Sequence, residues 1–305
     1  MKVLVTGGSS MVGKHLKKYL PDAIYLSSKD CDLFDSKKTK EFILDTKPDK
    51  VIHLAAKVGG IMDNISNPVG FFEDNIFINT NVLKYSYEAK VNQFIGILST
   101  CIYPDQVSDS LYPMKEDLLH SGPPTPTNFS YGYAKRCLAV QIDAYNKQFN
   151  TNYNYLTPCN LYSEHDHFEG NKAHFLSSLI HKIYQAKINN TKEINLMGSG
   201  SPLRQFMYAD DLAKVIYLFI KNNIIENCNV CTDEIKSIKQ IAEIALKACD
   251  ALDLNLKWDT TKPDGQYRKD ASSDKLLNIF KDFKFTSLDN GIKNTYNHYV
   301  EAKRV

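Results

Sequence analysis

Three side chains of this chain are spaced to move a proton to or from a carbonyl oxygen. Tyr131 and Lys135 stand four residues apart in "SYGYAKRCL", a spacing that places them on one face of a helix. A free phenol has a pKa of about 10, so we expect the neighbouring ammonium to favour the phenolate, helped by a water-poor site. Ser99 follows the strand-like run "QFIGIL", where its hydroxyl can hydrogen-bond a substrate carbonyl while Tyr131 donates to it. The competing interpretation is an amphipathic helix whose tyrosine and lysine have no chemical role.

Cys101 stands two residues after Ser99, in "STCIYPD". A thiol has a pKa of about 8.5 and exchanges protons near neutral pH after modest tuning. Packing is the alternative role, because free cysteine is among the most buried residue types. The position beside Ser99 favours Cys101 over the other cysteines as a proton carrier.

The other cysteines point to a reduced protein without a metal. The chain has seven cysteines, and it starts with "MKVLVTGG", which is typical of a strand entering a glycine turn and not of a signal peptide. We therefore expect free thiols and a cytoplasmic location. Cys228 and Cys231 form a lone CxxC in a strand-like setting, so we predict neither zinc binding nor redox chemistry there, and no metal site elsewhere.

Composition and charge exclude several classes of partner. The chain has 305 residues, of which 43% are hydrophobic and 24% charged, as in an ordinary globular protein. A formal net charge of +2 is too small to indicate nucleic-acid binding or an anionic membrane surface. No apolar run approaches the roughly 20 residues of a membrane helix, so we expect no membrane partner.

The elements that must position these side chains alternate along the first half of the chain. Near-continuous apolar runs, typical of strands buried on both faces of a parallel sheet, occur at residues 2–7, 50–56, 93–100 and 152–158. Amphipathic helix patterns separate them, among them "SSMVGKHLKKYL" and "SKKTKEFILDT". This alternation predicts a doubly wound α/β fold.

A glycine turn joins the first strand to the first helix, in "VTGGSSMVGKHL". Gly7 and Gly13 hold the outer positions of a TGxxGxxG loop, while Ser10 stands where the middle glycine belongs. Such a turn lets a phosphate approach the backbone at the N-terminus of a helix, so it favours dinucleotide binding. The loop residues predicted to contact the cofactor are Gly7, Gly8, Ser9, Ser10, Met11, Val12 and Gly13.

The end of the second strand indicates which dinucleotide binds. Ser28 and Lys29 follow that strand, at the position where a dinucleotide-binding fold contacts the adenosine ribose. Hydroxyls and a cation suit a 2′-phosphate, so we expect NADP(H). The alternative is that Lys29 is a solvated loop lysine.

The sequence predicts two lobes. Residues 1–162, with about 206–235, are expected to form a Rossmann-type NADP-binding domain with a doubly wound parallel sheet. Residues 163–205 and 236–305 are expected to form a smaller α/β substrate-binding lobe built mainly from C-terminal segments. In the second lobe, Ser237 and Gln240 are spaced as a capping box at the start of a helix.

Six further stretches carry a resemblance over nearly the whole chain: "HLAAKVGGI", "STCIYPD", "GPPTPTNFSYGYAKR", "CNLYSEHDHF", "GSGSPLRQF" and "KPDGQYRK". With these motifs the chain resembles the extended short-chain dehydrogenase/reductase family and, within it, the GDP-L-fucose synthases. The resemblance implies 3,5-epimerisation and then 4-keto reduction of GDP-4-keto-6-deoxy-D-mannose. It also implies hydride transfer from NADPH, and a homodimer.

The resemblance assigns roles to single residues. Cys101 matches the base of the epimerisation and His174 its partner acid, although His165, His167 and His181 compete for that role on sequence alone. Ser99, Tyr131 and Lys135 match the reductase set. The further residues implied in cofactor binding are Ala55, Ala56, Lys57, Tyr131, Lys135, Pro158, Asn160, Leu161 and His174.

Substrate contacts follow from the same resemblance. Arg204 and Lys182 match basic positions that hold the GDP part, Lys269 is a third candidate, and Asn160 is expected near the reacting sugar. Cations and donors of this kind suit a diphosphate. Solvated surface charge is the alternative, more so for Lys182 than for Arg204.

Several departures from the family pattern leave the fit of the sugar and base open. Ser10 and Ser163 replace expected glycines, "NVCTD" replaces a glycine-rich stretch, and Met197 stands where some relatives carry tryptophan. A second hypothesis is therefore a 4-reductase acting on a related GDP-4-keto sugar, such as a heptose for a surface polysaccharide. A third is a non-catalytic dinucleotide-binding sensor, which would not need the Ser-Tyr-Lys set.

Overall fold

The computed structural model of the chain describes residues 1–170, 173–262 and 264–304. Pro263, within the "KPDGQYRK" motif, and Asn171, Lys172 and Val305, within the expected second lobe, lie outside the described residues.

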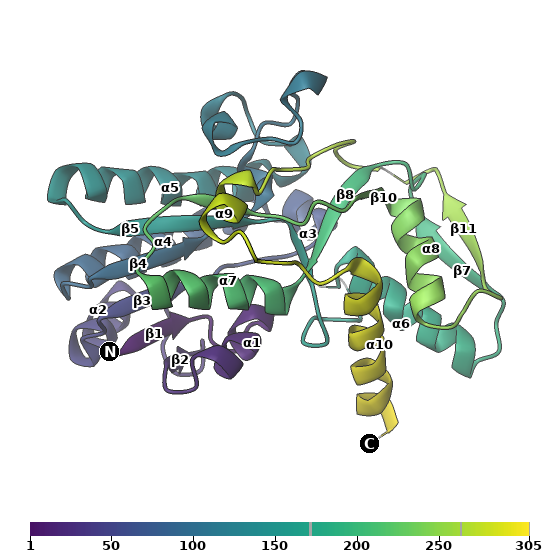
Figure 1. Cartoon of the computed structure of the whole chain (residues 1–305), viewed down its shortest axis with the longest axis horizontal. Helices are drawn as coiled ribbons and strands as arrows, with labels where there is room; N and C mark the ends of the chain where they lie inside the picture. The colour runs from purple at the N-terminus through teal and green to yellow at the C-terminus, as the bar shows by residue number, and fades with distance from the viewer. Residues whose placement is uncertain (171–172, 263, 305) are drawn as a thin grey trace.

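A six-stranded parallel sheet forms the first lobe, in the order β2-β1-β3-β4-β5-β9 (Figure 1). Its strands are β1 (Val3–Thr6), β2 (Ile24–Leu26), β3 (Lys50–His53), β4 (Gln93–Ile97), β5 (Tyr153–Pro158) and β9 (Cys228–Val230). Every residue of β1, β3, β4 and β5 is buried, as the apolar runs predict. From β1 the chain first adds β2 on one side and then β3 on the other, so the order of strand addition reverses between β1 and β3. Open α/β sheets bind ligands at the carboxyl ends of the strands beside such a switch point.

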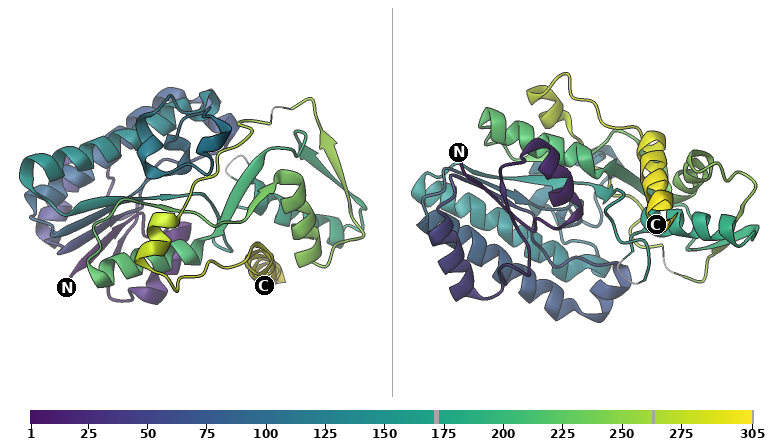
Figure 2. Two further views of the ribbon diagram at one scale, coloured as in Figure 1. Left: turned by 45° about the horizontal axis from the view of Figure 1, so that its top comes forward. Right: turned by 90° about the horizontal axis from the view of Figure 1, so that it is seen from below.

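Helices cover both faces of this sheet (Figures 1 and 2). Those of the first lobe are α1 (Met11–Tyr19), α2 (Ser36–Thr46), α3 (Ile61–Ser66), α4 (Pro68–Glu88), α5 (Phe129–Phe149) and α7 (Ala209–Asn222). α4 packs between α2 and α5 on one face, while α1 and α7 pack together on the other. The doubly wound α/β fold predicted from the sequence is confirmed.

The second lobe contains two small sheets and its own core. Its strands are β6 (Asn160–Tyr162), β7 (Glu193–Met197), β8 (Leu203–Tyr208), β10 (Ile235–Ser237) and β11 (Asn255–Asp259), in the orders β10-β8-β6 and β11-β7. Its helices are α6 (Phe175–Ile188), α8 (Ile238–Ala248) and α10 (Leu288–Arg304). The capping box is formed at α8, where Ser237 accepts from the Gln240 backbone and the Gln240 side chain accepts from the Ser237 backbone.

The C-terminal chain crosses between the lobes twice (Figure 1). After β11 it passes to α9 (Asp274–Ile279), which packs beside β9, and then returns to α10. Ala271, Leu276 and Phe283 belong to the core of the first lobe. The expected division of the chain into two lobes stays a prediction. Within the expected second-lobe range 236–305, residues 271–285 pack on the core of the first lobe, whereas α8 and α10 pack on the core of the second.

Candidate active site

The glycine turn between β1 and α1 has the backbone that a phosphate-binding loop needs. Gly7 has φ +69°, and a Cβ there would lie 2.7 Å from the backbone nitrogen of Ala55. Gly13 packs against the same turn, since its Cβ would lie 2.6 Å from the Gly8 carbonyl oxygen. Ser10, the departure from the loop pattern, is the N-cap of α1, and its Oγ accepts from the Gly13 N–H at 3.2 Å. The first N–H groups of a helix have no partner within the helix, and such groups are what an anion site requires.

The other predicted cofactor residues lie around the carboxyl ends of β2, β3 and β5. Ser28 and Lys29 are exposed in the turn after β2. Ala56 and Lys57 line a cavity of about 350 Å³ together with Asp32, Phe34, Asp74 and Ile78. Lys57 Nζ pairs with Asp74 at 2.7 Å. Ala55 follows β3 and Pro158 ends β5, both at the carboxyl ends of strands in the six-stranded sheet, whereas Leu161 is the middle residue of β6 in the sheet β10-β8-β6.

Tyr131 and Lys135 sit in the first two turns of α5, which packs against the residues just after β4. Lys135 is only 2% exposed, and its Nζ donates to the Ile97 carbonyl at 2.8 Å. Burial lowers the pKa of Lys135 to about 8. Burial, and to a smaller extent the Cys101 thiolate, raise the pKa of Tyr131.

The expected stabilisation of a Tyr131 phenolate stays a prediction. In this structure the Lys135 ammonium is directed to the Ile97 carbonyl, and removal from water disfavours the phenolate. The neutral phenol is the form that donates a proton, so this arrangement suits the reduction of a ketone.

Cys101 lies in a short 3-10 helix, Thr100–Ile102, whose N-cap is Ser99. Its Sγ lies 3.3 Å from Asn128 Nδ2 and 3.4 Å from Lys269 Nζ. Burial alone would raise the pKa of this thiol. The charge of Lys269 lowers it, as do the Ser99 and Asn128 side chains, and the lowering effects prevail. Cys101 is thus a half-buried thiol set up to become a thiolate.

His174 is the N-cap residue of α6. Its Nδ1 lies 3.6 Å from Asp166 Oδ1. The Asp166 carboxylate raises the pKa of His174 against the opposing effect of burial, and the Cys101 thiolate raises it further. His174 and Cys101 therefore influence each other's charge, which favours the protonated imidazole and the deprotonated thiol.

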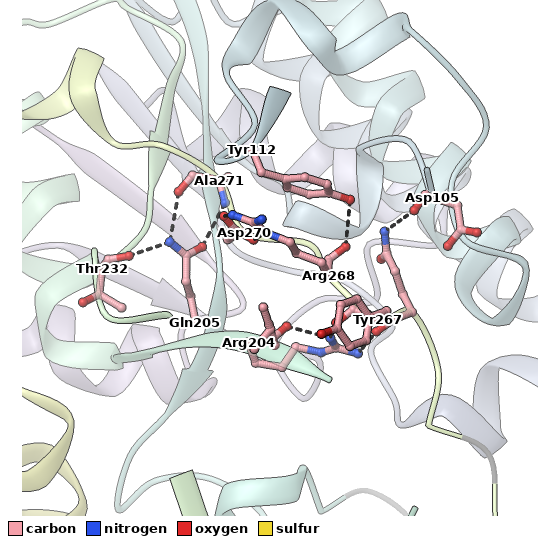
Figure 3. Close-up of polar contacts among 11 residues, drawn as sticks. Asp105, Tyr112, Arg204, Gln205, Thr232, Tyr267, Arg268, Asp270 and Ala271 are labelled. Carbon is pink, nitrogen blue, oxygen red and sulfur yellow. Dashed lines mark hydrogen bonds and ion pairs between the residues drawn. The ribbon is translucent and has the colours of Figure 1, made fainter. Parts of the chain in front are cut away.

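Residues 266–271, here called the crossing segment, bring Lys269 to this site. Figure 3 shows the polar contacts that Tyr112, Arg204 and Gln205 make with this segment. Gln266 donates to the Asp105 carbonyl at 2.8 Å, and Tyr112 donates to the Arg268 carbonyl at 3.1 Å. Gln205 fixes the far end, since its side chain donates to the Ala271 carbonyl and accepts from the Ala271 N–H, both at 3.0 Å. The crossing segment is thus held on both sides of Lys269.

The predicted substrate residues are only partly grouped with these side chains. Arg204 is engaged by backbone carbonyls, from Nη1 to Leu203 and Tyr267 and from Nη2 to Gln266. Burial lowers its pKa and the Cys101 thiolate raises it, which places Arg204 in the environment of the thiol. Asn160 Nδ2 donates to the Gln205 carbonyl at 2.7 Å.

Lys182 is placed differently. Its Nζ donates to the Asn195 carbonyl at 2.8 Å, from α6 to β7, and burial lowers its pKa. Its ammonium therefore already has a partner within the second lobe.

Two residues were missed by the sequence analysis. Asn128 bonds the Cys101 thiol and Asp166 contacts His174. Both stand inside quoted motifs, "GPPTPTNFSYGYAKR" and "CNLYSEHDHF", so the motifs contained the signal. Lys269 was expected at the diphosphate, whereas the structure places it on the Cys101 sulfur.

The remaining cysteines are free. Cys228 and Cys231 are both buried in and after β9, and Cys231 Sγ lies 3.8 Å from the Thr157 carbonyl oxygen. Across the part of the chain that the structure describes, none of the helices combines the length and apolarity needed to cross a membrane.

Comparison with known proteins agrees with the fold and with the resemblance seen in the motifs. The model of the NAD dependent epimerase/dehydratase family matches residues 3–231. The chain is 39% identical to the GDP-L-fucose synthase of Dictyostelium discoideum, over 98% of this chain and 95% of that protein. A GDP-L-fucose synthetase from Naegleria fowleri, solved bound to NADP, has a TM-score of 0.89 at 35% identity, covering 100% of this chain and 94% of the other.

A GDP-6-OMe-4-keto-L-xylo-heptose reductase from C. jejuni also has a TM-score of 0.89, covering 99% of this chain and 98% of the other, but its 22% identity shows the fold alone. The resemblance seen in the motifs is confirmed at the level of the full-length relatives. The chain belongs to the NAD dependent epimerase/dehydratase family and, within it, to the GDP-L-fucose synthase family.

Proposed function

We propose that this chain converts GDP-4-keto-6-deoxy-D-mannose to GDP-L-fucose by 3,5-epimerisation and NADPH-dependent 4-reduction. Membership of the family makes it an epimerase/reductase enzyme. The observation that carries the epimerase half is the Cys101 thiol with Lys269 and Asn128 at 3.4 and 3.3 Å. A site that only reduces a ketone does not need a thiol whose pKa is lowered.

Cys101 is the proposed base of the epimerisation. The 4-keto group acidifies the hydrogens on carbons 3 and 5, so a thiolate can take one of these protons while the electron pair moves to the keto oxygen as an enolate. His174, whose pKa Asp166 raises, returns a proton to the opposite face of the same carbon. One C–H bond breaks and another forms at each centre, so the configuration inverts without net oxidation.

Tyr131 is the proposed proton donor of the reduction. NADPH, when bound, supplies the hydride that reaches carbon 4. The half-buried and neutral Tyr131 phenol gives its proton to the oxygen that becomes the hydroxyl. Ser99 holds the same oxygen by a hydrogen bond, and Lys135, anchored on Ile97, keeps positive charge beside the phenol.

The residues around the glycine turn fit a dinucleotide. Gly7 and Gly13 allow a close approach that a Cβ would block, and the α1 N-terminus offers N–H groups to the pyrophosphate. Ser28 and Lys29, exposed after β2, are proposed to hold a 2′-phosphate. The other cofactor residues predicted above keep their proposed roles.

Arg204 and Asn160 are the proposed contacts to the GDP-sugar, and Lys182 is a weaker candidate. A guanidinium has five N–H donors, so Arg204 keeps free donors after its carbonyl contacts. Lys182 must give up its bond to Asn195 to reach a phosphate.

The enzyme is further proposed to be a cytoplasmic homodimer that binds neither nucleic acid nor membrane. Support for the dimer comes from the α4–α5 layer, where large apolar side chains are exposed, namely Val69, Phe72, Phe77, Phe129, Val140 and Phe149. A second copy of this layer would cover them.

The test is a reaction in deuterated water with NADPH and GDP-4-keto-6-deoxy-D-mannose. We expect deuterium at carbons 3 and 5 of the product, and NADPH oxidation in equal amount to GDP-L-fucose. Reduction without deuterium uptake, or a preference for a GDP-4-keto-heptose, would replace the proposal by the 4-reductase hypothesis. NADPH binding without turnover of any GDP-4-keto sugar would favour the sensor.

A further inference from the structure

Two histidines and a glutamate meet outside the candidate active site. His15 lies on α1, while Glu164 and His165 follow β6. One potential ligand atom from each lies within 4.8 Å of the other two. None of the three has a role in the proposed reaction. The cluster joins the first helix of one lobe to the loop where the chain enters the other lobe.

The imidazole of His15 is buried and incompletely paired. His15 is 8% exposed, and its Nε2 has no hydrogen-bond partner among the described residues. Glu164 Oε1 lies 3.8 Å from it, beyond hydrogen-bond range. A buried nitrogen without a partner costs free energy, so a ligand that bound Nε2 would remove this cost.

The outer contacts of the cluster are those that orient metal ligands. His15 Nδ1 lies 3.5 Å from Asp210 Oδ1, and Nε2 of the same ring lies 3.8 Å from Glu164 Oε1. Tyr208 donates to Glu164 Oε2 at 2.7 Å, so Oε1 is left free. Asp210 is itself fixed by Tyr19 at 2.8 Å and Lys18 at 3.1 Å. A histidine backed by a carboxylate is the usual second layer of a metal site.

We propose that His15, Glu164 and His165 bind one divalent transition-metal ion, with zinc the best match. Two imidazoles and a carboxylate are a zinc ligand set, and the exposed His165 leaves a fourth position to water. Ligand atoms around tetrahedral zinc stand about 3.4 Å apart, given bonds of about 2.0–2.1 Å. The His15–Glu164 separation of 3.8 Å is close to that value, and His165 closes the site by a side-chain rotation.

The bound ion would tie α1 to the β6–α6 connection. The role is structural, because the site shares no ligand with Cys101, Tyr131 or His174 and the fold already supplies the proposed chemistry. We therefore expect the metal to raise thermal stability while reduction in the presence of a chelator continues.

The experiment measures metal binding by the tag-free, chelator-treated full chain. Equilibrium dialysis against zinc is expected to retain one ion per chain, and cobalt(II) is expected to give visible absorption bands without a thiolate charge-transfer band. His15→Ala, Glu164→Gln and His165→Ala should each weaken zinc binding at least tenfold. Asp210→Asn should weaken it about 10- to 100-fold through His15.

Controls separate this site from the cysteines and from misfolding. His120→Ala changes an exposed histidine elsewhere and should bind zinc as the parent chain does. Circular dichroism and NADPH affinity report whether each variant is folded, and His165, being exposed, tests the site without disturbing the core. Absence of a retained ion, a thiolate band with cobalt, or full binding by Glu164→Gln and His165→Ala would each overturn the proposal.

Discussion

The Cys101 thiol has an ammonium on one side and an amide on the other, at 3.4 and 3.3 Å. Cys101→Ser keeps the size of the side chain but raises the pKa of the base far above neutral. We expect deuterium exchange at carbons 3 and 5 to fall by about 10²-fold or more, while a ketone already epimerised is still reduced. Cys137→Ser, which changes an exposed thiol, is the matched control. Equal loss of both activities would contradict separate roles.

Tyr131 is tested in the same way for the reduction. Tyr131→Phe removes only the hydroxyl and keeps the ring beside Phe71, 6.4 Å away between centroids. NADPH oxidation should fall by about 10²- to 10⁴-fold because the alkoxide loses its proton donor. NADPH affinity, measured by fluorescence titration, should stay near that of the parent. Tyr133→Phe, on the same helix, should retain activity; a similar loss there would refute the assignment of Tyr131.

Lys269 determines the pH at which Cys101 becomes a base. Its charge lowers the pKa of the thiol, so Lys269→Met should raise that pKa. Exchange requires the thiolate, and its rate rises as pH passes the thiol pKa. The rising limb of the exchange-versus-pH profile should therefore move to higher pH in this variant, with exchange restored at alkaline pH. Lys239→Met removes an exposed lysine elsewhere as the control. An unmoved limb would show that Lys269 only binds substrate.

At the scale of elements, helix starts place much of the chemistry. α1 begins beside the phosphate-binding turn, α5 presents Tyr131 and Lys135 in its first turns, and α6 begins at His174. Polar side chains gather where helices begin because free backbone N–H groups and ligands meet there. The caps therefore serve both stability and position.

The capping box of α8 gives a test of this stability that leaves the active site untouched. Ser237→Ala removes the oxygen that accepts from the Gln240 N–H at 3.1 Å. The free energy of unfolding, measured by urea denaturation, should fall by about 1 kcal/mol. Ser237→Thr should recover most of the loss, and Lys239→Ala should have little effect. A loss below about 0.3 kcal/mol would mean that packing of α8 makes the box redundant.

Much of the order of strands and helices could be predicted because the local sequence shows which segments are buried. Strands β1, β3, β4 and β5 are buried on both faces, and their apolar runs show it directly. Ser10 shows the limit of motif matching. Compared with a glycine pattern it is a departure, but serine is a preferred N-cap and Ser10 Oγ fills that role.

Contacts across long sequence separations could not be predicted. Lys269 is 168 residues from Cys101, and His15 is about as far from Glu164. No periodicity or spacing relates such pairs, because the crossing segment and the lobe junction decide them. The effect of burial on the pKa of Tyr131 could not be predicted for a related reason, since burial depends on everything that packs around the phenol.

At the scale of the whole molecule, the α4–α5 layer is where a second copy is expected. Val140 is 51% exposed on α5. Val140→Lys would place a charge in the apolar contact, so sedimentation velocity should show monomers where the parent chain sediments as a dimer. Leu252→Lys, at a side chain 73% exposed after α8, should leave the dimer intact. A dimeric Val140→Lys chain would place the interface elsewhere.

The crossing segment has a consequence for how this enzyme can change. It carries Lys269, whose charge lowers the pKa of the Cys101 thiol, whereas Lys135 is held by the Ile97 carbonyl of β4. A change confined to Lys269 in this segment would thus stop proton removal from carbons 3 and 5, while reduction of the 4-keto group would continue. An enzyme that epimerises and reduces can therefore become one that only reduces, with no change in the residues that bind its nucleotides.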